Sequence, residues 1–210
     1  MQLDEYVQHL IAGEDEICIA EGKALALDLP GLHRLYVEVI QPSQRRVGEL
    51  WEGGQVSVAT EHLATATNSY VATTCYTPLA RHAAGGPRAM IACTPDEMHE
   101  LGARLLSDLL ELDGWDIDFY GTSMPLRDLI DAIRLRQPRF VGLSAALVMH
   151  LGSVKRTIAA IREQLGPHTP PIVVGGNAFA GNDELWKTVG ADFYAKDASE
   201  AVETLRSLRA

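Results

Sequence analysis

The sequence lacks several features that would assign it to common classes of protein. None of its apolar runs approaches the roughly 20 residues of a membrane-spanning helix, and the N-terminus MQLDEYVQHL has neither the basic start nor the apolar core of a signal peptide. Basic residues are outnumbered, 18 Lys and Arg against 28 Asp and Glu, which gives a net charge of −10. We therefore expect a cytoplasmic protein that binds neither membranes nor, directly, DNA.

Cysteine is scarce, and phosphate-binding glycine motifs are missing. Cys18, Cys75 and Cys93 are an odd number, widely spaced, with no C-x-x-C pair. This pattern favours reduced, mostly buried thiols over a disulfide framework or a zinc site. No G-x-G-x-x-G follows the first predicted strand and there is no P-loop, which argues against the usual dinucleotide and nucleoside triphosphate sites.

The first part of the chain, up to about residue 85, has helical periodicity. Apolar residues recur at i, i+3, i+4 and i+7, and the pattern predicts four helices: 3–11, 15–29, 32–51 and 56–80. We expect Pro30-Gly31 to close the second helix and Pro42 to interrupt the third. Four helices with short connections predict a four-helix bundle over residues 1–85.

The segment AAGGPR at 83–88 is the best linker candidate, and after it strand and helix patterns alternate. Short apolar runs predict five strands: 89–93, 115–120, 140–145, 171–174 and 192–194. Helical patterns follow them at 100–112, 126–136, 152–165, 183–189 and 198–209. Together they predict a Rossmann-like (flavodoxin-like) five-stranded parallel sheet domain over residues 86–210, hence an α/β protein with a helical N-terminal half.

In such a sheet, ligands bind beyond the carboxyl ends of the strands. The loop after the first strand, TPDEMHELG, contains His99, the strongest metal-ligand candidate at that edge. Glu97, two residues earlier, is placed to accept a hydrogen bond from the imidazole and orient it. One imidazole is too few for zinc, but it is enough for a metal that brings most of its own ligands, as haem and corrinoids do.

The stretch EMHELG, Glu97 to Gly102, resembles the D/E-x-H-x-x-G loop of cobalamin-binding domains. Later signatures of that family align in the same order, namely Ser144, Gly175-Gly176, Gly190-Ala191-Asp192 and Asp197-Ala198. The resemblance implies that His99 replaces the cofactor's own base beneath cobalt. It also implies that the detached base and its nucleotide tail enter a slot beside Ser144 and the glycine pair.

One position departs from this family pattern. The usual S-x-L reads Ser144-Ala145-Ala146, so the smaller Ala146 alters the fit of the tail slot. The resemblance adds Met98, Gly102, Tyr194 and Asp197 to the cofactor-binding candidates.

A second resemblance lies in the helical half. Trp51, followed after nine residues by Glu61-His62, resembles the W-x(9)-E-H signature of cobalamin-dependent photoreceptors related to light-sensing repressors of carotenoid genes. The resemblance implies that Trp51 covers the adenosyl group of adenosylcobalamin, that Glu61 and His62 hydrogen-bond to it, and that light breaks the cobalt–carbon bond. An indole over a purine and a carboxylate accepting from ribose hydroxyls are sound roles for these side chains.

Two departures from the photoreceptors change what is expected. Those repressors have an N-terminal DNA-binding domain, whereas this chain begins with the bundle. They also capture cobalt after photolysis with a histidine directly after the tryptophan, where this chain has Glu52, so either the light product differs or His62 or His150 takes that role. A chain without that histidine suits the photocobilin branch, which pairs cobalamin with a bilin such as biliverdin.

Each assignment has a plainer structural alternative. A lone histidine near a helix start is most often a solvated residue or a structural one with its hydrogen bonds satisfied, and Glu61-His62 taken alone reads as an exposed helical turn. Tyr120, Met124 and Met149 suit cofactor-lining and packing roles equally. Three non-enzymatic functions follow: a light-sensing regulator acting through a homo-oligomer or a protein partner, a corrinoid carrier of a methyltransferase system, and a passive cobalamin store or antirepressor.

Overall fold

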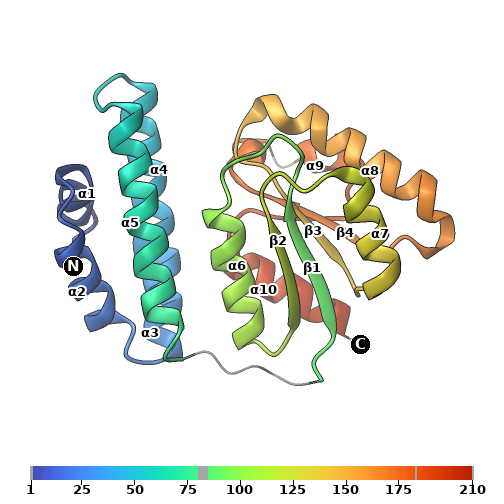
Figure 1. Ribbon diagram of the computed structural model, residues 1–210, viewed down its shortest axis with the longest axis horizontal. Helices are drawn as coiled ribbons and strands as arrows, with labels where there is room; N and C mark the ends of the chain where they lie inside the picture. Colours follow the sequence, from blue (N-terminus) through green and yellow to red (C-terminus); the bar gives the residue numbers. More distant parts are fainter. Residues whose placement is uncertain (1, 80–84, 183, 210) are drawn as a thin grey trace. The chain divides into compact units, whose positions relative to one another are not determined.

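The computed structural model describes residues 2–79, 85–182 and 184–209, and the chain divides into two compact units, Met1–Ala80 and Arg81–Ala210 (Figure 1). The boundary predicted between residues 85 and 86 lies close to this division. Residues 83 and 84 of the predicted linker lie outside the described residues. Of the helices in the described ranges, none is both long and apolar enough to cross a membrane.

The first unit is entirely helical. Its elements are α1 (Leu3–Ala12), α2 (Asp15–Leu25), α3 (Leu29–Arg34), the π-helix η1 (Leu35–Ile40), α4 (Gln41–Glu52) and α5 (Val58–Tyr76). Because α3, η1 and α4 follow one another without a break, the unit consists of four helical segments, as predicted. Helices α2 and α5 pack closely: a Cβ on Gly22 would lie 2.6 Å from Val71 Cγ1.

The two predictions made from prolines were wrong. Helix α2 ends at Leu25, and Pro30 lies in the first turn of α3, where a missing N–H costs nothing and Asp28 Oδ1 accepts a hydrogen bond from the Gly31 amide at 2.8 Å. Pro42 does not interrupt the third helix. In an α-helix its ring would clash with the carbonyl of Glu38, and the wider π turns of η1, directly before it, accommodate the ring.

The second unit is a five-stranded parallel sheet. Its strands are β1 (Arg88–Cys93), β2 (Asp116–Gly121), β3 (Val141–Ser144), β4 (Ile172–Gly175) and β5 (Phe193–Ala195), in the order β2-β1-β3-β4-β5. The helices are α6 (Leu101–Leu112), α7 (Leu126–Arg136), α8 (Leu151–Leu165), α9 (Leu185–Thr188) and α10 (Ala198–Arg206). This architecture confirms the flavodoxin-like prediction.

In the second unit, the last two predicted helices are shorter than expected. Helix α9 is a single turn, and residue 183, the first of the predicted segment 183–189, lies outside the described residues. The last helix ends at Arg206 and continues as a 3-10 turn over Ser207–Arg209.

Alternate residues of β1 face two separate hydrophobic cores. Ala89, Ile91 and Cys93 pack with buried residues of α6 and α10. Met90 and Ala92 pack with buried residues of α7 and α8. The sheet is therefore covered on both faces (Figure 1), which leaves its carboxyl edge as the place where loops meet.

Candidate cofactor site at the carboxyl edge of the sheet

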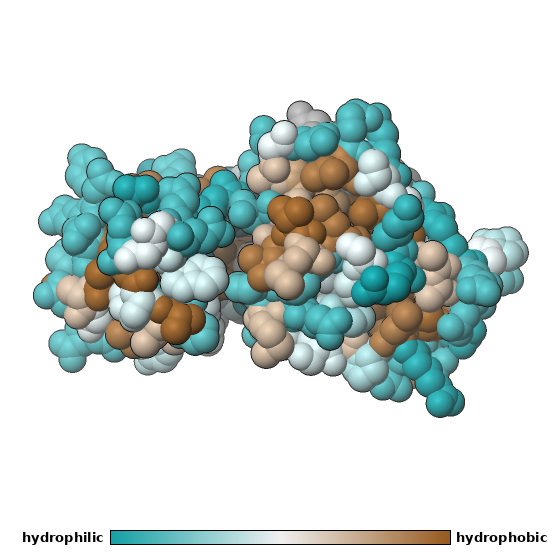
Figure 2. All heavy atoms as spheres, turned by 90° about the horizontal axis from the view of Figure 1, so that it is seen from above, coloured by the Kyte–Doolittle hydropathy of each residue, from teal (hydrophilic) through white to brown (hydrophobic). Residues whose placement is uncertain are grey.

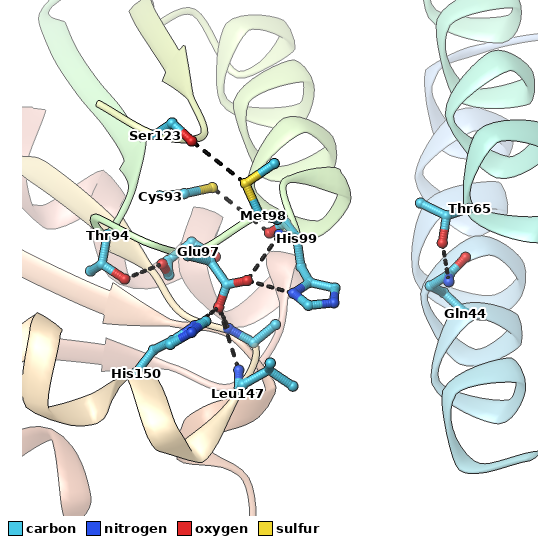
Figure 3. Close-up of polar contacts among 12 residues, drawn as sticks. Gln44, Thr65, Cys93, Thr94, Glu97, Met98, His99, Ser123, Leu147 and His150 are labelled. Atoms are coloured by element: carbon cyan, nitrogen blue, oxygen red, sulfur yellow. Dashed lines mark hydrogen bonds and ion pairs between the residues drawn. The ribbon is translucent and has the colours of Figure 1, made fainter. Parts of the chain in front are cut away.

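A buried glutamate joins the two loops that flank the point where strand order reverses. Glu97, in the loop after β1, has no exposed side-chain surface. Its Oε1 accepts hydrogen bonds from the backbone amide of His99 at 2.9 Å and from His99 Nδ1 at 2.5 Å (Figure 3). Its Oε2 accepts from the amides of Ala146 at 2.7 Å and Leu147 at 3.4 Å, and from His150 Nδ1 at 2.8 Å. One carboxylate thus binds groups from both loops.

The first loop is held by further contacts. The amide of Thr94 donates to the Ser144 carbonyl at 3.1 Å, and the hydroxyl of Ser153 donates to the Pro95 carbonyl at 3.1 Å. Asp96 has φ = 73°, in the left-handed region, and this turn directly precedes Glu97. The loop therefore places Glu97 inward and leaves the next two side chains, Met98 and His99, at the surface.

The contact with Glu97 determines how His99 can act. Because Nδ1 donates to the carboxylate, Nε2 holds the lone pair of the neutral ring. The side chain is 47% exposed, and Figure 3 shows Nε2 on the side of the ring away from Glu97. An imidazole oriented by a carboxylate in this way is the usual arrangement of a metal ligand. The expected hydrogen bond from the His99 ring to Glu97 is confirmed.

Glu97 remains ionised. Burial by itself raises its pKa, but the hydrogen bonds from His99, His150 and the amides of His99 and Ala146 outweigh burial and hold the pKa well below its usual range. An ionised carboxylate accepts hydrogen bonds only, so both histidines present a donor Nδ1 to it.

His150 is the partner that the sequence analysis missed. It was considered only as a group that moves to cobalt after photolysis, whereas here it is bound to Glu97 and its side chain is 14% exposed. Its position at the start of α8, after β3, places it at the same edge as His99. That position is the one signal in the sequence that pointed to it.

Exposed apolar side chains lie in the same two loops. Met98 is 67% exposed, Val148 67% and Met149 79%, and the Ser123 hydroxyl lies 3.5 Å from Met98 Sδ. Figure 2 looks onto the edge at which the strands end and shows hydrophobic side chains gathered there. A Cβ on Gly102 would meet no described atom within 4 Å. Within the α/β unit these apolar side chains are exposed, which suits contact with a flat, apolar ligand.

Strand register brings Ser144 and the glycine pair together. Ser144, the last residue of β3, pairs with Gly175 of β4. Gly176 has φ = 103°, and a Cβ there would lie 2.3 Å from the Ala145 carbonyl oxygen. The close approach of two loops therefore requires Gly176 whether or not a cofactor base binds beside it.

Two other predicted residues have structural roles. The carboxylate of Asp197 caps α10 by accepting from the Glu200 amide at 2.9 Å. The ring of Tyr194 packs against Phe179, with 6.0 Å between the centroids. Neither contact needs a cofactor, and the cofactor contacts of these two residues stay predictions.

The candidates of the helical unit differ in exposure. Trp51, in the last turn of α4, is 40% exposed, and the His62 side chain is 75% exposed. The Glu61 side chain is only 13% exposed, because its Oε1 accepts from Gln44 Nε2 at 3.0 Å and from the Thr65 hydroxyl at 2.9 Å. Sequence reasoning missed Gln44 and Thr65, and the plain alternative of an exposed turn holds for His62 but not for Glu61.

Comparison with known families identifies the family of the chain. Residues 87–205, more than half of the chain, match the family model of the B12 binding domain, and residues 2–73 match a second model described in the same words. The chain belongs to the B12-binding domain family. The donor set suits this cofactor, since a single oriented imidazole and an open apolar surface serve a metal that brings a flat macrocycle.

Relatives of known name fall into two groups. HTH-type transcriptional repressor CarH of Myxococcus xanthus is 36% identical over 154 residues, which are 71% of this chain and 49% of CarH. Dimethylamine corrinoid protein 3 of Methanosarcina acetivorans is 28% identical over 113 residues, 53% of this chain and 52% of that protein. The chain thus spans about half the length of these curated relatives.

Solved structures share the fold. The monomethylamine corrinoid protein of Methanosarcina barkeri matches with a TM-score of 0.81 and 16% identity, over 98% of this chain and 97% of that one. A cobalamin-binding protein from Desulfitobacterium hafniense DCB-2 matches with a TM-score of 0.54 and 19% identity, over 99% and 98%. At these identities the likeness shows the fold alone.

Proposed function

We propose that the protein is a cobalamin-binding, light-sensing regulatory protein in which His99 ligates cobalt in place of the cofactor's own base. The observation that supports this most is the Glu97–His99 contact, because it leaves Nε2 as the ligating nitrogen on an exposed ring. His150 and the amides of Ala146 and Leu147 keep Glu97 in place, so the imidazole is oriented before any cofactor arrives.

We further propose adenosylcobalamin as the form bound. Trp51 offers a partly exposed indole, Glu61 a carboxylate held by two donors, and His62 an exposed imidazole. These groups suit a ligand that combines a flat purine with ribose hydroxyls. When bound, the cofactor supplies visible absorption and a cobalt–carbon bond that light breaks.

The output of the sensor is proposed to be a change in contacts made by the helical unit. That unit exposes Leu27, Leu63 and Tyr70, which are 79%, 50% and 60% exposed and suit contact with a second copy or a protein partner. The proposed partner of these residues is a protein and not DNA. Because Glu52 stands where the related photoreceptors have their second cobalt ligand, we include biliverdin as a second chromophore to be tested.

A second candidate is a corrinoid carrier of a methyltransferase system. The matches to the dimethylamine and monomethylamine corrinoid proteins favour it. It uses the same His99 site but gives no role to Trp51, Glu61 and His62.

The deciding experiment loads the purified protein in the dark with adenosylcobalamin, methylcobalamin or hydroxocobalamin, each with and without biliverdin. Spectra and gel-filtration elution volumes are recorded before and after illumination. Free adenosylcobalamin is itself photolabile, so the sensor proposal requires a bound product with its own spectrum and a light-dependent change in elution. An illuminated protein that releases its cofactor as free hydroxocobalamin, with unchanged elution, overturns the sensor proposal and favours the carrier.

A further inference from the structure

Hydrogen bonds form a continuous path from Glu61 to the buried centre of the helical unit. The Tyr6 hydroxyl donates to Asn68 Oδ1 at 3.0 Å, and Asn68 Nδ2 donates to Gln44 Oε1 at 3.0 Å. Gln44 Nε2 donates in turn to Glu61 Oε1 at 3.0 Å and to the Thr65 hydroxyl at 2.6 Å (Figure 3 shows the latter contact). The path crosses three helices, α1, α5 and α4.

The path has a direction that the chemistry of its ends imposes. An ionised carboxylate only accepts hydrogen bonds, so Gln44 must turn its NH2 group toward Glu61. The carbonyl oxygen of Gln44 then faces Asn68, which must present its own NH2 group, and the Asn68 oxygen faces Tyr6. Reversing any one amide would place like groups against each other.

Burial makes this direction costly to change. The side chains of Tyr6 and Asn68 have no exposed surface. Asn68 Nδ2 also lies 3.3 Å from the hydroxyl of Ser43, which is itself buried and donates to the Ile40 carbonyl at 3.0 Å. Buried polar groups need their partners, because a lost hydrogen bond there is not replaced by water.

The π-helix before α4 determines which side chains reach α5. A π turn accommodates an extra residue, which rotates the following side chains by about 100° relative to an uninterrupted α-helix. Ser43 and Gln44 directly follow η1 and Pro42, and both contact Asn68 of α5. The unusual segment at 35–42 therefore sets the phase of α4 that brings Gln44 to Glu61.

We propose that Gln44, supported by Thr65 and Asn68, is a positioning residue for Glu61 and determines selectivity for the upper ligand of the bound cobalamin. Gln44 and Thr65 both engage Oε1, so Oε2, 3.7 Å from His62 Nε2, is the oxygen that accepts a hydroxyl of the ligand. The inference rests on the proposed function and names the residues that prepare its upper-ligand contact.

The principal test compares two identical changes on one helix, Gln44→Glu and Gln41→Glu. Gln44→Glu places a second carboxylate against Glu61 Oε1, whereas Gln41 lies at the start of α4 outside the path. Dissociation constants for adenosylcobalamin and hydroxocobalamin are measured in the dark. We expect Gln44→Glu to reduce the preference for adenosylcobalamin roughly tenfold or more, while Gln41→Glu leaves it unchanged and both bind hydroxocobalamin as the wild type does.

A second set of three variants keeps the test valid where Gln44→Glu disturbs folding, which circular dichroism reports. Thr65→Val removes the hydroxyl that donates to Glu61, Thr65→Ser retains it, and Thr74→Val makes the same change elsewhere on α5. The preference for adenosylcobalamin should fall in Thr65→Val alone and be restored in Thr65→Ser.

A third readout needs no cofactor. In the cofactor-free protein, the protons of the Gln44 and Asn68 side-chain NH2 groups should exchange slowly with solvent. Glu61→Gln should shift the NMR resonances of both groups, although of these two side chains Glu61 contacts only that of Gln44. A wild type with equal affinity for the two cobalamins overturns the proposed upper ligand and the selectivity role together. A wild type that prefers adenosylcobalamin, with Gln44→Glu equal to Gln41→Glu, overturns the positioning role alone.

Discussion

Among the candidate site residues, Glu61 of the helical unit and Glu97 of the α/β unit are both held by hydrogen bonds, but by different means. Glu97 is fully buried and accepts hydrogen bonds from two histidines and from backbone amides of two loops. Glu61 is 13% exposed, and the hydrogen bonds to its carboxylate within the described residues come from two side chains, those of Gln44 and Thr65.

The difference shows how much each site depends on its surroundings. Backbone amides at the ends of parallel strands stay in place whatever their side chains are, so the sheet itself supplies part of the environment of Glu97. Gln44 reaches Glu61 only when α4 and α5 are rotated about their axes so that these two side chains face each other. We therefore expect changes at the sheet edge to have large effects and changes in the bundle to have selective ones.

The largest effect is expected for the metal ligand. His99→Ala should lose the spectrum of histidine-ligated, base-off cobalamin or most of the affinity for hydroxocobalamin, because His150, the second imidazole bound to Glu97, is only 14% exposed. The control is His168→Ala, an exposed histidine of the same unit. An unchanged spectrum in His99→Ala contradicts the assignment of the ligand.

Trp51→Ala, in the other unit, should change selectivity among upper ligands and leave hydroxocobalamin binding largely intact.

The next effect compares the two carboxylates directly. Glu97→Gln should lower the free energy of unfolding of the cofactor-free α/β unit by about 3 kcal/mol, since buried donors lose a charged acceptor. Glu61→Gln should cost less than about 1 kcal/mol, since its donors are neutral and partly exposed. Urea denaturation measures both, and equal losses would remove the proposed distinction.

The pH dependence has a definite sign. The pKa of Glu97 is lowered in the folded state, so its contribution to stability is present above the unfolded value, about 4.3, and is lost as the pH falls toward the folded value. The difference in stability between wild type and Glu97→Gln should therefore shrink below about pH 4. A difference that grows on acidification would contradict an ionised Glu97.

A smaller effect is expected at the second histidine. His150→Ala should destabilise the cofactor-free protein by about 1 to 2 kcal/mol, because Glu97 Oε2 loses one donor and keeps its amides. His150→Asn, which retains an N–H near the position of Nδ1, should recover most of the loss. Equal stability of the two variants would show that His150 contributes by packing instead of hydrogen bonding.

The smallest effect is expected where the units do not differ. Cys18, Cys75 and Cys93 are all buried, as predicted, and burial raises the pKa of Cys18 to about 11 and that of Cys93 to about 12. Native protein should therefore react with thiol reagents at neutral pH far more slowly than denatured protein. In Glu97→Gln, labelling should accelerate at Cys93 and not at the two helical cysteines, which mass spectrometry of the labelled peptides can resolve.

Much of the α/β unit could be read from the sequence because its signals are local. Buried strands are short apolar runs, and Glu97 lies two residues from His99, so one turn is enough to bring them together. The helix cap made by Asp197 and the contact of the Tyr194 ring with Phe179 could not be read from such local signals, and the cofactor contacts of these two residues stay predictions.

The helical unit was less predictable at its prolines. Pro30 and Pro42 are both helix breakers by propensity, but the first occupies a first turn and the second follows a π-helix. The helix propensity of proline does not predict that a helical segment can contain either residue, because this depends on the hydrogen bonds of the neighbouring turn.

The sequence by itself determined the two fold classes, the sheet edge proposed to bind cobalamin, and the pairing of Glu97 with His99. Only the tertiary structure decided that His150, 53 residues from Glu97, shares its carboxylate, and that Gln44, 17 residues from Glu61, orients the other. The physical reason is how far apart the contacting residues lie in the sequence. Residues within one turn are neighbours in the sequence, whereas contacts between loops depend on strand register and contacts between helices depend on helix phase.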